Sequence, residues 1–313
     1  MKVVFFGTGE IALPTFRAAI ASEDCEVLAL VTQPDKAVGR SGKLRPPAIK
    51  TIALEAGISV LQPEKVRAPD ALAELAALKA DVYVVMAYGQ ILPQELIDQP
   101  NEAIINLHAS LLPRYRGASC IQAAIDEGDS ITGWTVMHVV KALDAGDMIA
   151  NLEVAIELED TAASLHDRLA ELAPEIFLKA FGQLQRNEVS RTPQNDEAST
   201  YVPKLEREAG LLDWSWSAER LARRIRAYFS WPGTYSHFTD SKGREKRLKI
   251  FPIVDVLEAA SSQAPGTVVA TEGSKLVIAC GEGQLQLNEV QADGGKRISA
   301  TDFQRGNQVT RLF

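Results

Sequence analysis

The first half of the chain alternates short apolar runs with helical segments, and this alternation constrains the fold more than any other feature. The apolar run at residues 3–6 ends at Gly7, and a helix is expected from Leu13-Pro14 because proline in a first helical turn loses no hydrogen bond. Such alternation predicts an α/β domain with a mostly parallel, Rossmann-like sheet covered by helices on both faces. The other predicted strands are 27–31, 82–86, 103–108, 135–140 and 152–156, and the other predicted helices are 70–78, 119–126 and 161–184.

A second domain is expected after a polar segment. Residues 186–200 contain Asn, Gln, Ser, Thr and Pro without an apolar period, which predicts a linker. A helix over 218–229 follows, and short β-type runs divided by turns then continue to the end, which is typical of a small OB-like β-barrel. We therefore expect a catalytic domain at 1–188, a linker at 189–207 and a C-terminal β-barrel domain at 208–313.

The composition is that of a globular protein, with 46% hydrophobic and 24% charged residues among 313. The apolar run at the N-terminus is too short for a signal peptide, and no stretch approaches the roughly 20 apolar residues of a membrane span. Cys25, Cys120 and Cys280 are odd in number and far apart, so they predict neither a disulfide framework nor a zinc site. A reducing compartment, the cytoplasm, is the expected location.

The charge is unevenly distributed along the chain. The formal net charge is −8, but the segment from Lys204 to Phe313 holds 16 basic and 13 acidic residues, leaving 17 and 28 before it. Such asymmetry indicates a polyanionic partner for the C-terminal part, although chance variation along a chain produces similar differences.

A glycine turn near the start raises the possibility of a dinucleotide site. Gly7, Gly9 and Ala12 match the G-x-G-x-x-A pattern, and Asp35 follows the second predicted strand. Glu10, however, puts a carboxylate where a pyrophosphate would bind, and Pro34 displaces Asp35 from the strand end. A tight turn that needs small residues is therefore the favoured interpretation, and a nicotinamide-dependent oxidoreductase is a distant alternative.

Asn106 and His108 are the strongest candidates for catalysis. Alternate residues of a strand share a face, so both side chains point the same way at the C-terminal end of strand 103–108. Open α/β sheets have their ligand crevice at this end. An amide donor beside an imidazole suits a reaction that passes through an oxyanion.

A carboxylate is expected to orient His108. Asp144 and Asp147 follow the predicted strand 135–140, and Asp144 lies nearer to its end. Side chains of these types also commonly cap turns, and His138 is interpreted as a hydrogen-bonded core histidine. No cluster of ligands predicts a metal.

Residues 105–117 and 143–149 resemble the formyltransferase family that uses 10-formyltetrahydrofolate, and the resemblance extends over essentially the whole chain. It implies that Asn106, His108 and Asp144 form a catalytic triad and that no metal is needed. It also implies two folate-binding segments. Tyr115 and the Ser119-Cys120 pair depart from the family pattern at positions outside this chemistry. The implied folate-binding residues are Ser110, Leu111, Leu112 and Pro113, and Ala87, Tyr88, Gly89, Gln90 and Ile91.

The triad does not identify the acceptor, because related enzymes also formylate nucleotide-sugar amines. The loop at 34–47 resembles an insertion that contacts the acceptor end of initiator tRNA, and spaced cations suit a phosphate backbone. A solvated surface loop is the alternative interpretation. The resemblance implies a monomer that formylates the α-amino group of methionine on initiator methionyl-tRNA, with reduced folate as donor. The candidate tRNA-binding residues are Lys36, Arg40, Lys43, Arg45, Lys204, Arg223 and Arg224.

Overall fold

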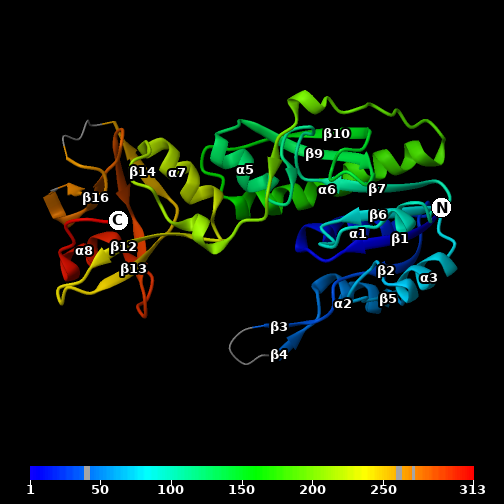
Figure 1. Cartoon of the computed structure of the whole chain (residues 1–313), viewed down its shortest axis with the longest axis horizontal. Coiled ribbons are helices and arrows are strands. Elements are labelled where there is room, and N and C mark those ends of the chain that lie inside the picture. Colours follow the sequence, from blue (N-terminus) through cyan, green and yellow to red (C-terminus); the bar gives the residue numbers. More distant parts are fainter. Residues whose placement is uncertain (39–42, 259–262, 270–271) are drawn as a thin grey trace. The chain divides into compact units, whose positions relative to one another are not determined.

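The computed structural model describes residues 1–38, 43–258, 263–269 and 272–313 (Figure 1). The chain divides into two compact units that alternate along the sequence. Unit 1 comprises Met1–Gly117, Thr132–Ala155 and His166–Val202, and unit 2 comprises Ala118–Ile131, Ile156–Leu165 and Pro203–Phe313. Among the described residues, no helix is both long and apolar enough to cross a membrane.

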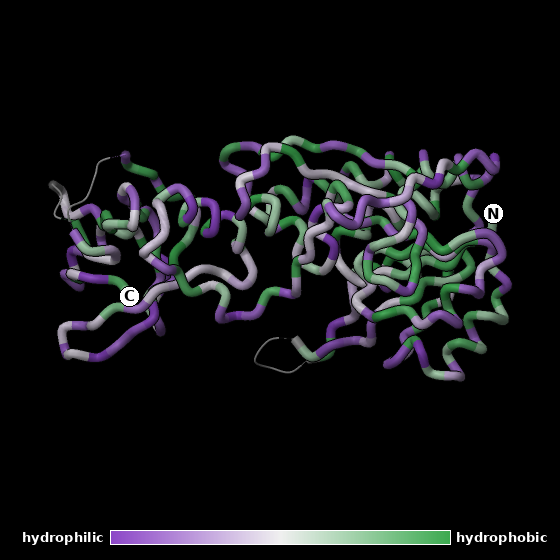
Figure 2. Tube along the Cα trace, turned by 45° about the horizontal axis from the view of Figure 1, so that its top comes forward, coloured by the Kyte–Doolittle hydropathy of each residue, from purple (hydrophilic) through white to green (hydrophobic). Residues whose placement is uncertain are grey.

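Unit 1 is built on a seven-stranded sheet with the strand order β10-β9-β7-β6-β1-β2-β5. The strands β1, β2, β5, β6 and β7 are parallel, whereas β9 runs antiparallel to β7. The predicted, mostly parallel α/β sheet is therefore confirmed, and apolar residues concentrate along its strands (Figure 2). The bounds are β1 (Lys2–Gly7), β2 (Glu26–Val31), β5 (Ser59–Leu61), β6 (Val82–Met86), β7 (Ala103–His108), β9 (Ile131–His138) and β10 (Met148–Ala155).

Apolar sequence on both faces of the central strands explains why helices cover the sheet. All five residues of β6 are buried, as expected of a parallel strand with covered faces. The indole of Trp134 on β9 donates a hydrogen bond to the main-chain oxygen of Leu169 on α6 at 2.8 Å. The helices are α1 (Leu13–Ala21), α2 (Ala48–Glu55), α3 (Pro69–Ala77), α4 (Gln94–Ile97) and α6 (Ala162–Gln185).

Two segments that the sequence predicted as irregular are ordered by strand pairing. The predicted basic loop is an antiparallel hairpin of β3 (Lys36–Val38) and β4 (Lys43–Arg45). The predicted linker contributes β11 (Tyr201–Val202), which pairs in parallel with β8 (Arg116–Gly117). The polar segment is thus part of unit 1 as far as Val202.

Unit 2 contains two antiparallel sheets, with the orders β12-β13-β18-β19 and β14-β17-β16-β15. They share one core with α7, whose Leu221 and Ile225 are buried in it. The expected β-rich C-terminal domain is confirmed, with its strands divided between two sheets. The bounds are α5 (Cys120–Glu127), α7 (Ala218–Ala227), β12 (Thr234–Thr239), β13 (Glu245–Ile250), β14 (Val254–Leu257), β15 (Val268–Val269), β16 (Leu276–Ala279), β17 (Gln284–Leu287), β18 (Glu289–Ala292), β19 (Ile298–Ser299) and α8 (Ala300–Asn307).

Candidate active site

Asn106 and His108 lie at the C-terminal end of β7, two residues apart and therefore on one face of the sheet. Asn106 is partly exposed, and its side-chain amide has no hydrogen-bond partner among the described residues. His108 is buried beside Thr135 of β9, its register partner. The pair thus combines an uncommitted amide donor with an imidazole that its surroundings hold in place.

The imidazole of His108 is fixed mainly by the main chain. Its Nε2 lies 2.8 Å from the main-chain oxygen of Tyr115, and a carbonyl oxygen only accepts, so Nε2 carries the hydrogen. Its Nδ1 lies 3.7 Å from Oδ2 of Asp144, which is an ion-pair distance and too long for a hydrogen bond. The expected carboxylate is therefore beside the ring, while Tyr115 sets the ring's orientation.

Asp144 makes its shorter contact to β8. Its Oδ2 accepts a hydrogen bond from the main-chain N–H of Gly117 at 2.8 Å. Asp144 and Tyr115 both have a left-handed backbone, with φ of 50° and 59°. Non-glycine residues in that conformation cost about 1–3 kcal/mol each and concentrate at functional sites. The two loops that flank His108 are thus held in a strained but cross-linked arrangement.

The predicted folate-binding segment at residues 110–113 is organised by one hydroxyl group. Thr135 Oγ1 donates to the main-chain oxygen of Ser110 at 2.7 Å and accepts from the N–H of Leu112 at 3.1 Å. The Ser110 hydroxyl in turn donates to the main-chain oxygen of Arg114 at 2.7 Å. A polar side chain on β9 therefore fixes the loop that leaves β7.

The polar segment before β11 supplies residues that the sequence did not single out. Gln194 Nε2 donates to the main-chain oxygens of Asp144 and Gly146, both at 2.8 Å. Gln194 Oε1 accepts from Nε and Nη2 of Arg116 at 3.0 and 2.8 Å. The hydroxyl of Thr200 accepts from the N–H of Tyr115 at 2.8 Å. This segment therefore joins the loop of Asp144 to the loop that orients His108.

The second predicted folate-binding segment follows β6 and contacts the glycine turn. The N–H of Gly9 donates to the main-chain oxygen of Ala87 at 3.2 Å, and the Thr8 hydroxyl donates to that of Tyr88 at 3.1 Å. The Tyr88 ring packs in the core, and burial raises the pKa of its hydroxyl to about 12. Ile91, by contrast, is 87% exposed. The exposed residues of this segment are thus Ala87, Gly89 and Ile91, while the Tyr88 ring supports the fold.

Asp35 has partners that fit the turn interpretation of the glycine motif. Its carboxylate contacts Lys50 Nζ at 2.9 Å and Gln62 Nε2 at 2.8 Å. The hydrogen bond from Gln62, followed by that from Lys50, lowers the pKa of Asp35.

His138 is buried as expected, but its Nε2 has no hydrogen-bond partner among the described residues, so the prediction of a hydrogen-bonded histidine is wrong for this nitrogen. In the described part of the chain, no group of three His, Cys, Asp or Glu could hold a metal ion.

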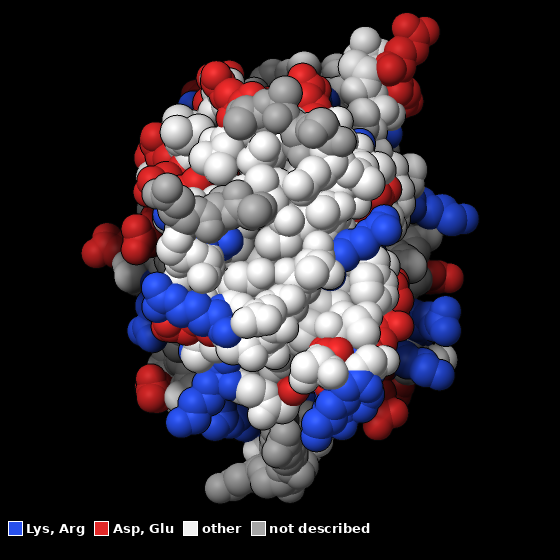
Figure 3. All heavy atoms as spheres, turned by 90° about the vertical axis from the view of Figure 1, so that its left-hand side faces the viewer, with Lys and Arg blue, Asp and Glu red and all other residues white. Residues whose placement is uncertain are grey.

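The candidate tRNA-binding residues differ in their surroundings. Lys36, Arg45 and Lys204 are exposed, Arg40 lies outside the described residues, and of Lys43 only the backbone in β4 is described. Arg224 forms an ion pair with Asp126 at 2.7 Å, and Arg223 Nε donates to the main-chain oxygen of Asp126 at 3.0 Å. On the face drawn in Figure 3, acidic side chains are most numerous towards the top, and several basic side chains lie in the middle and lower part. Arg223 and Arg224 thus have a role within unit 2, and their contact with RNA stays a prediction.

Comparison with known proteins identifies the class to which this fold and site belong. The family model described as formyl transferase matches residues 1–181, and the model for the formyl transferase C-terminal domain matches residues 204–308. Two solved structures share the fold. An N-formyltransferase from Helicobacter canadensis in complex with folinic acid and dTDP-3-aminofucose is 15% identical, with a TM-score of 0.64 over 95% of this chain and 99% of that one. HypX from Aquifex aeolicus in complex with tetrahydrofolic acid is 18% identical, with a TM-score of 0.59 over 97% of this chain, which spans only 47% of HypX. The protein is an enzyme of the formyltransferase class.

A relative with higher identity narrows the class. The methionyl-tRNA formyltransferase of Akkermansia muciniphila is 47% identical over 98% of this chain and 97% of its own length. The chain belongs to the methionyl-tRNA formyltransferase family. The formyltransferase class was predicted from residues 105–117 and 143–149, and the RNA acceptor from other parts of the chain.

Proposed function

We propose that this chain transfers a formyl group from 10-formyltetrahydrofolate to the α-amino group of methionine on initiator methionyl-tRNA, as an early step of translation initiation. Its family membership supports this function. The observation that carries the proposal is the constellation at the end of β7, in which the free amide of Asn106 and the imidazole of His108 share a face and the carboxylate of Asp144 lies 3.7 Å from the ring.

The reaction begins with attack of the neutral amine on the formyl carbon. An α-amino group has a pKa of about 7.7–8.0, so a useful fraction is neutral near pH 7 without a strong base. Asn106 donates its N–H to the oxyanion of the tetrahedral intermediate. When the intermediate collapses, the bond from the formyl carbon to the aryl nitrogen of the folate breaks, the amine loses one proton, and the folate nitrogen gains one.

His108 stabilises the oxyanion or moves this proton. Because Nε2 donates to Tyr115, Nδ1 is the nitrogen available for proton exchange, and it faces the carboxylate of Asp144. Asp144 thus lies beside the ring, while the main-chain oxygen of Tyr115 sets the ring's orientation. Residues 110–113 and 87–91 bind the reduced folate at the same end of the sheet.

The proposed division of labour follows the two matched regions. Residues 1–188 form the catalytic domain, residues 189–207 link it to the second domain, and residues 208–313 form the tRNA-binding domain. The chain acts as a monomer in the cytoplasm. Lys36, Arg40, Lys43, Arg45 and Lys204 contact RNA phosphates, whereas Arg223 and Arg224 contact Asp126 within unit 2.

The test is a transfer assay with labelled formyl-folate and charged initiator tRNA. Elongator methionyl-tRNA and a nucleotide-sugar amine serve as competing acceptors. Labelled formyl-methionine on the initiator tRNA, with much lower rates for the other two acceptors, is the expected result. Preferential labelling of the sugar amine would replace the proposed function by the second candidate.

A further inference from the structure

A pocket of about 430 Å³ in unit 2 is lined by aromatic and basic side chains. The aromatic residues are Phe229, Trp231, Tyr235 and Phe251, and the charged residues are Arg207, Arg247 and Lys249. All of its charged lining residues are basic, although the chain as a whole has a net charge of −8. Its volume lies within the roughly 300–1,000 Å³ typical of ligand sites.

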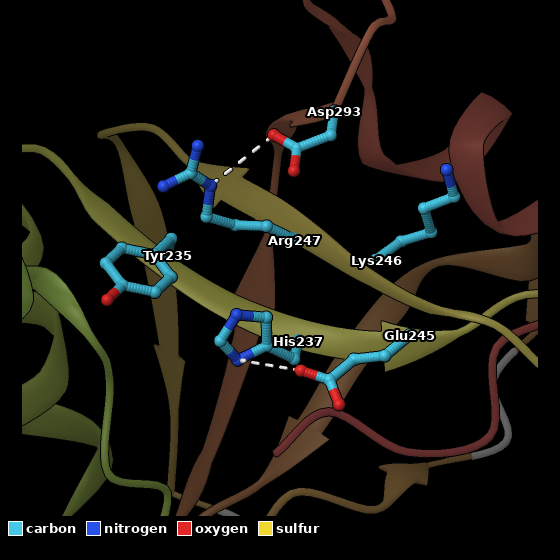
Figure 4. A pocket seen from close by; sticks show the side chains of 6 residues that line it. All are labelled: Tyr235, His237, Glu245, Lys246, Arg247 and Asp293. Atoms are coloured by element: carbon cyan, nitrogen blue, oxygen red, sulfur yellow. Dashed lines mark hydrogen bonds and ion pairs between the residues drawn. The ribbon is translucent and has the colours of Figure 1, made fainter.

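The sheet register explains why these groups converge. Tyr235 of β12 pairs with Lys249 of β13, and Lys249 pairs with Gln291 of β18, so the three side chains share one face. His237 and Arg247, the next register pair on that face, line an adjoining hollow of about 300 Å³ (Figure 4). Glu245 and Asp293 also line this hollow, so the surface whose charged residues are all basic is confined to the larger pocket.

Trp231 is positioned for stacking. Its side chain is 50% exposed, and its indole N–H donates to the main-chain oxygen of Leu205 at 3.4 Å. The hydrogen bond holds one edge of the indole while half of its surface stays accessible. Exposure of a large aromatic residue beside cations is more typical of a binding site than of a structural position.

The cations differ in how far they are already neutralised. Arg247 contacts Asp293 at 3.4 Å and lies over the Tyr235 ring at 5.4 Å from its centroid. Neither Arg207 nor Lys249, both exposed, has an ion-pair partner among the described residues. Two unneutralised cations beside aromatic rings attract an anion that also has a planar group.

We propose that this pocket binds an unpaired nucleotide of the RNA substrate, with its base stacked on Trp231 and its phosphate on Lys249 and Arg207. The inference rests on the proposed function, since it assigns the pocket to the RNA that carries the acceptor amine. Base stacking combined with backbone cations is the physical basis of single-strand recognition, and it tolerates any base. A paired helix would present phosphates to the cations but no exposed base to the indole.

The test compares a single-stranded RNA tetranucleotide with a blunt RNA duplex, titrated against the full chain by fluorescence anisotropy. Trp231→Ala should weaken tetranucleotide binding by about 5- to 150-fold, Trp231→Phe should restore most of it, and duplex binding should stay unchanged. Lys249→Ala should reduce the slope of log K against log salt by about 0.7 for the tetranucleotide, whereas the exposed Lys242→Ala should not.

Three results would overturn the inference. They are equal losses for tetranucleotide and duplex, no loss in Trp231→Ala, or equally tight binding of a free nucleoside monophosphate, which would indicate a small-molecule site. Formylation of charged tRNA separates this inference from the proposed function. A raised KM for tRNA with unchanged kcat in Trp231→Ala supports both. A normal KM for tRNA in that variant would contradict only the proposal for the pocket. If the wild type bound the tetranucleotide but transferred no formyl group, only the proposed function would be contradicted.

Discussion

Gln194 donates a hydrogen bond from Nε2 to the main-chain oxygen of Asp144 at 2.8 Å, across 50 residues of sequence. The same side chain accepts from Arg116, whose neighbour Gly117 donates to the Asp144 carboxylate. One amide thus fixes the loop of Asp144 and the strand that the carboxylate contacts. Gln194 is a positioning residue for the proposed reaction.

Gln194→Leu should lower kcat by about 10- to 100-fold while leaving the KM for the formyl donor nearly unchanged. The loop of Asp144 loses its anchor, and displacement of a catalytic group by about 1 Å can cost up to about 10² in rate. Steady-state kinetics with charged tRNA measure both parameters. Gln94→Leu, an exposed glutamine that bonds only to Asp98, is the matched control, and wild-type kcat in Gln194→Leu would contradict the role.

Single alanine variants of Asn106, His108 and Asp144 should each lose about 10²–10³ in turnover and still bind folate. Because the three groups act on one intermediate, a double variant should lose little more than its worse parent. Single-turnover transfer separates chemistry from binding. Asp147→Ala, the other carboxylate of that loop, is the control. Near-normal transfer by His108→Ala would contradict the proposed mechanism.

Much of the site follows from local sequence rules. The period of two along a strand predicts that Asn106 and His108 share a face, and sheet topology locates that face at the strand's C-terminal end. Alternating apolar runs predicted four of the five parallel strands, and the exception is β5, whose three residues give no period. Helix α2 was not predicted either.

The rest depends on contacts between distant segments. Thr200 and Tyr115 are 85 residues apart, and nothing in a polar segment without periodicity indicates which main-chain groups it will contact. The polar residues of this segment led to the prediction of a linker, and two of them, Gln194 and Thr200, form the hydrogen bonds to the site. A main-chain oxygen, that of Tyr115, orients His108, and such a partner leaves no mark in the side-chain sequence.

Gly117→Ala should destabilise the protein by several kcal/mol and lower its activity. The backbone has φ of 108°, and a β-carbon there would lie 2.3 Å from the main-chain oxygen of Val202, so β8 and β11 must separate. Urea denaturation measures the change. Gly57 has a φ of 70° with open space around it. Gly57→Ala should therefore lower the free energy of unfolding by only about 1–2 kcal/mol, the cost of the backbone conformation. Equal losses in the two variants would contradict the steric explanation.

Arg224→Ala should reduce the free energy of unfolding in the absence of RNA. Its guanidinium contacts both carboxylate oxygens of Asp126 at 2.7 Å, with side chains only 14% and 12% exposed. Removing one partner of a fully buried pair costs about 3–5 kcal/mol because the other charge is left unpaired, and this partly exposed pair should lose less than that. The double variant with Asp126→Ala should therefore lose less than the sum of the single variants.

Lys204→Ala separates RNA binding from stability. This exposed lysine should leave urea denaturation unchanged but reduce the salt dependence of tRNA affinity, as a phosphate contact requires. Arg224→Ala, compared under the same conditions, should mainly change stability. A stable Arg224→Ala variant with a reduced salt slope would reverse the assignment and return Arg224 to the RNA-binding residues.

His138 should make stability depend on pH. Burial lowers the pKa of its imidazole, Arg191 lowers it further, and Asp147 opposes the shift. Between this lowered pKa and the value of about 6.5 in the unfolded chain, the unfolded state binds more protons. The free energy of unfolding therefore falls as the pH falls from about 7, by up to about 1.4 kcal/mol for each pH unit between the two values. Urea denaturation at pH 7.5 and 5.5 should give a smaller difference for His138→Gln than for the wild type. Arg191→Gln, which removes one cause of the lowered pKa, should lie between them, and an unchanged pH dependence in His138→Gln would assign the effect to other groups.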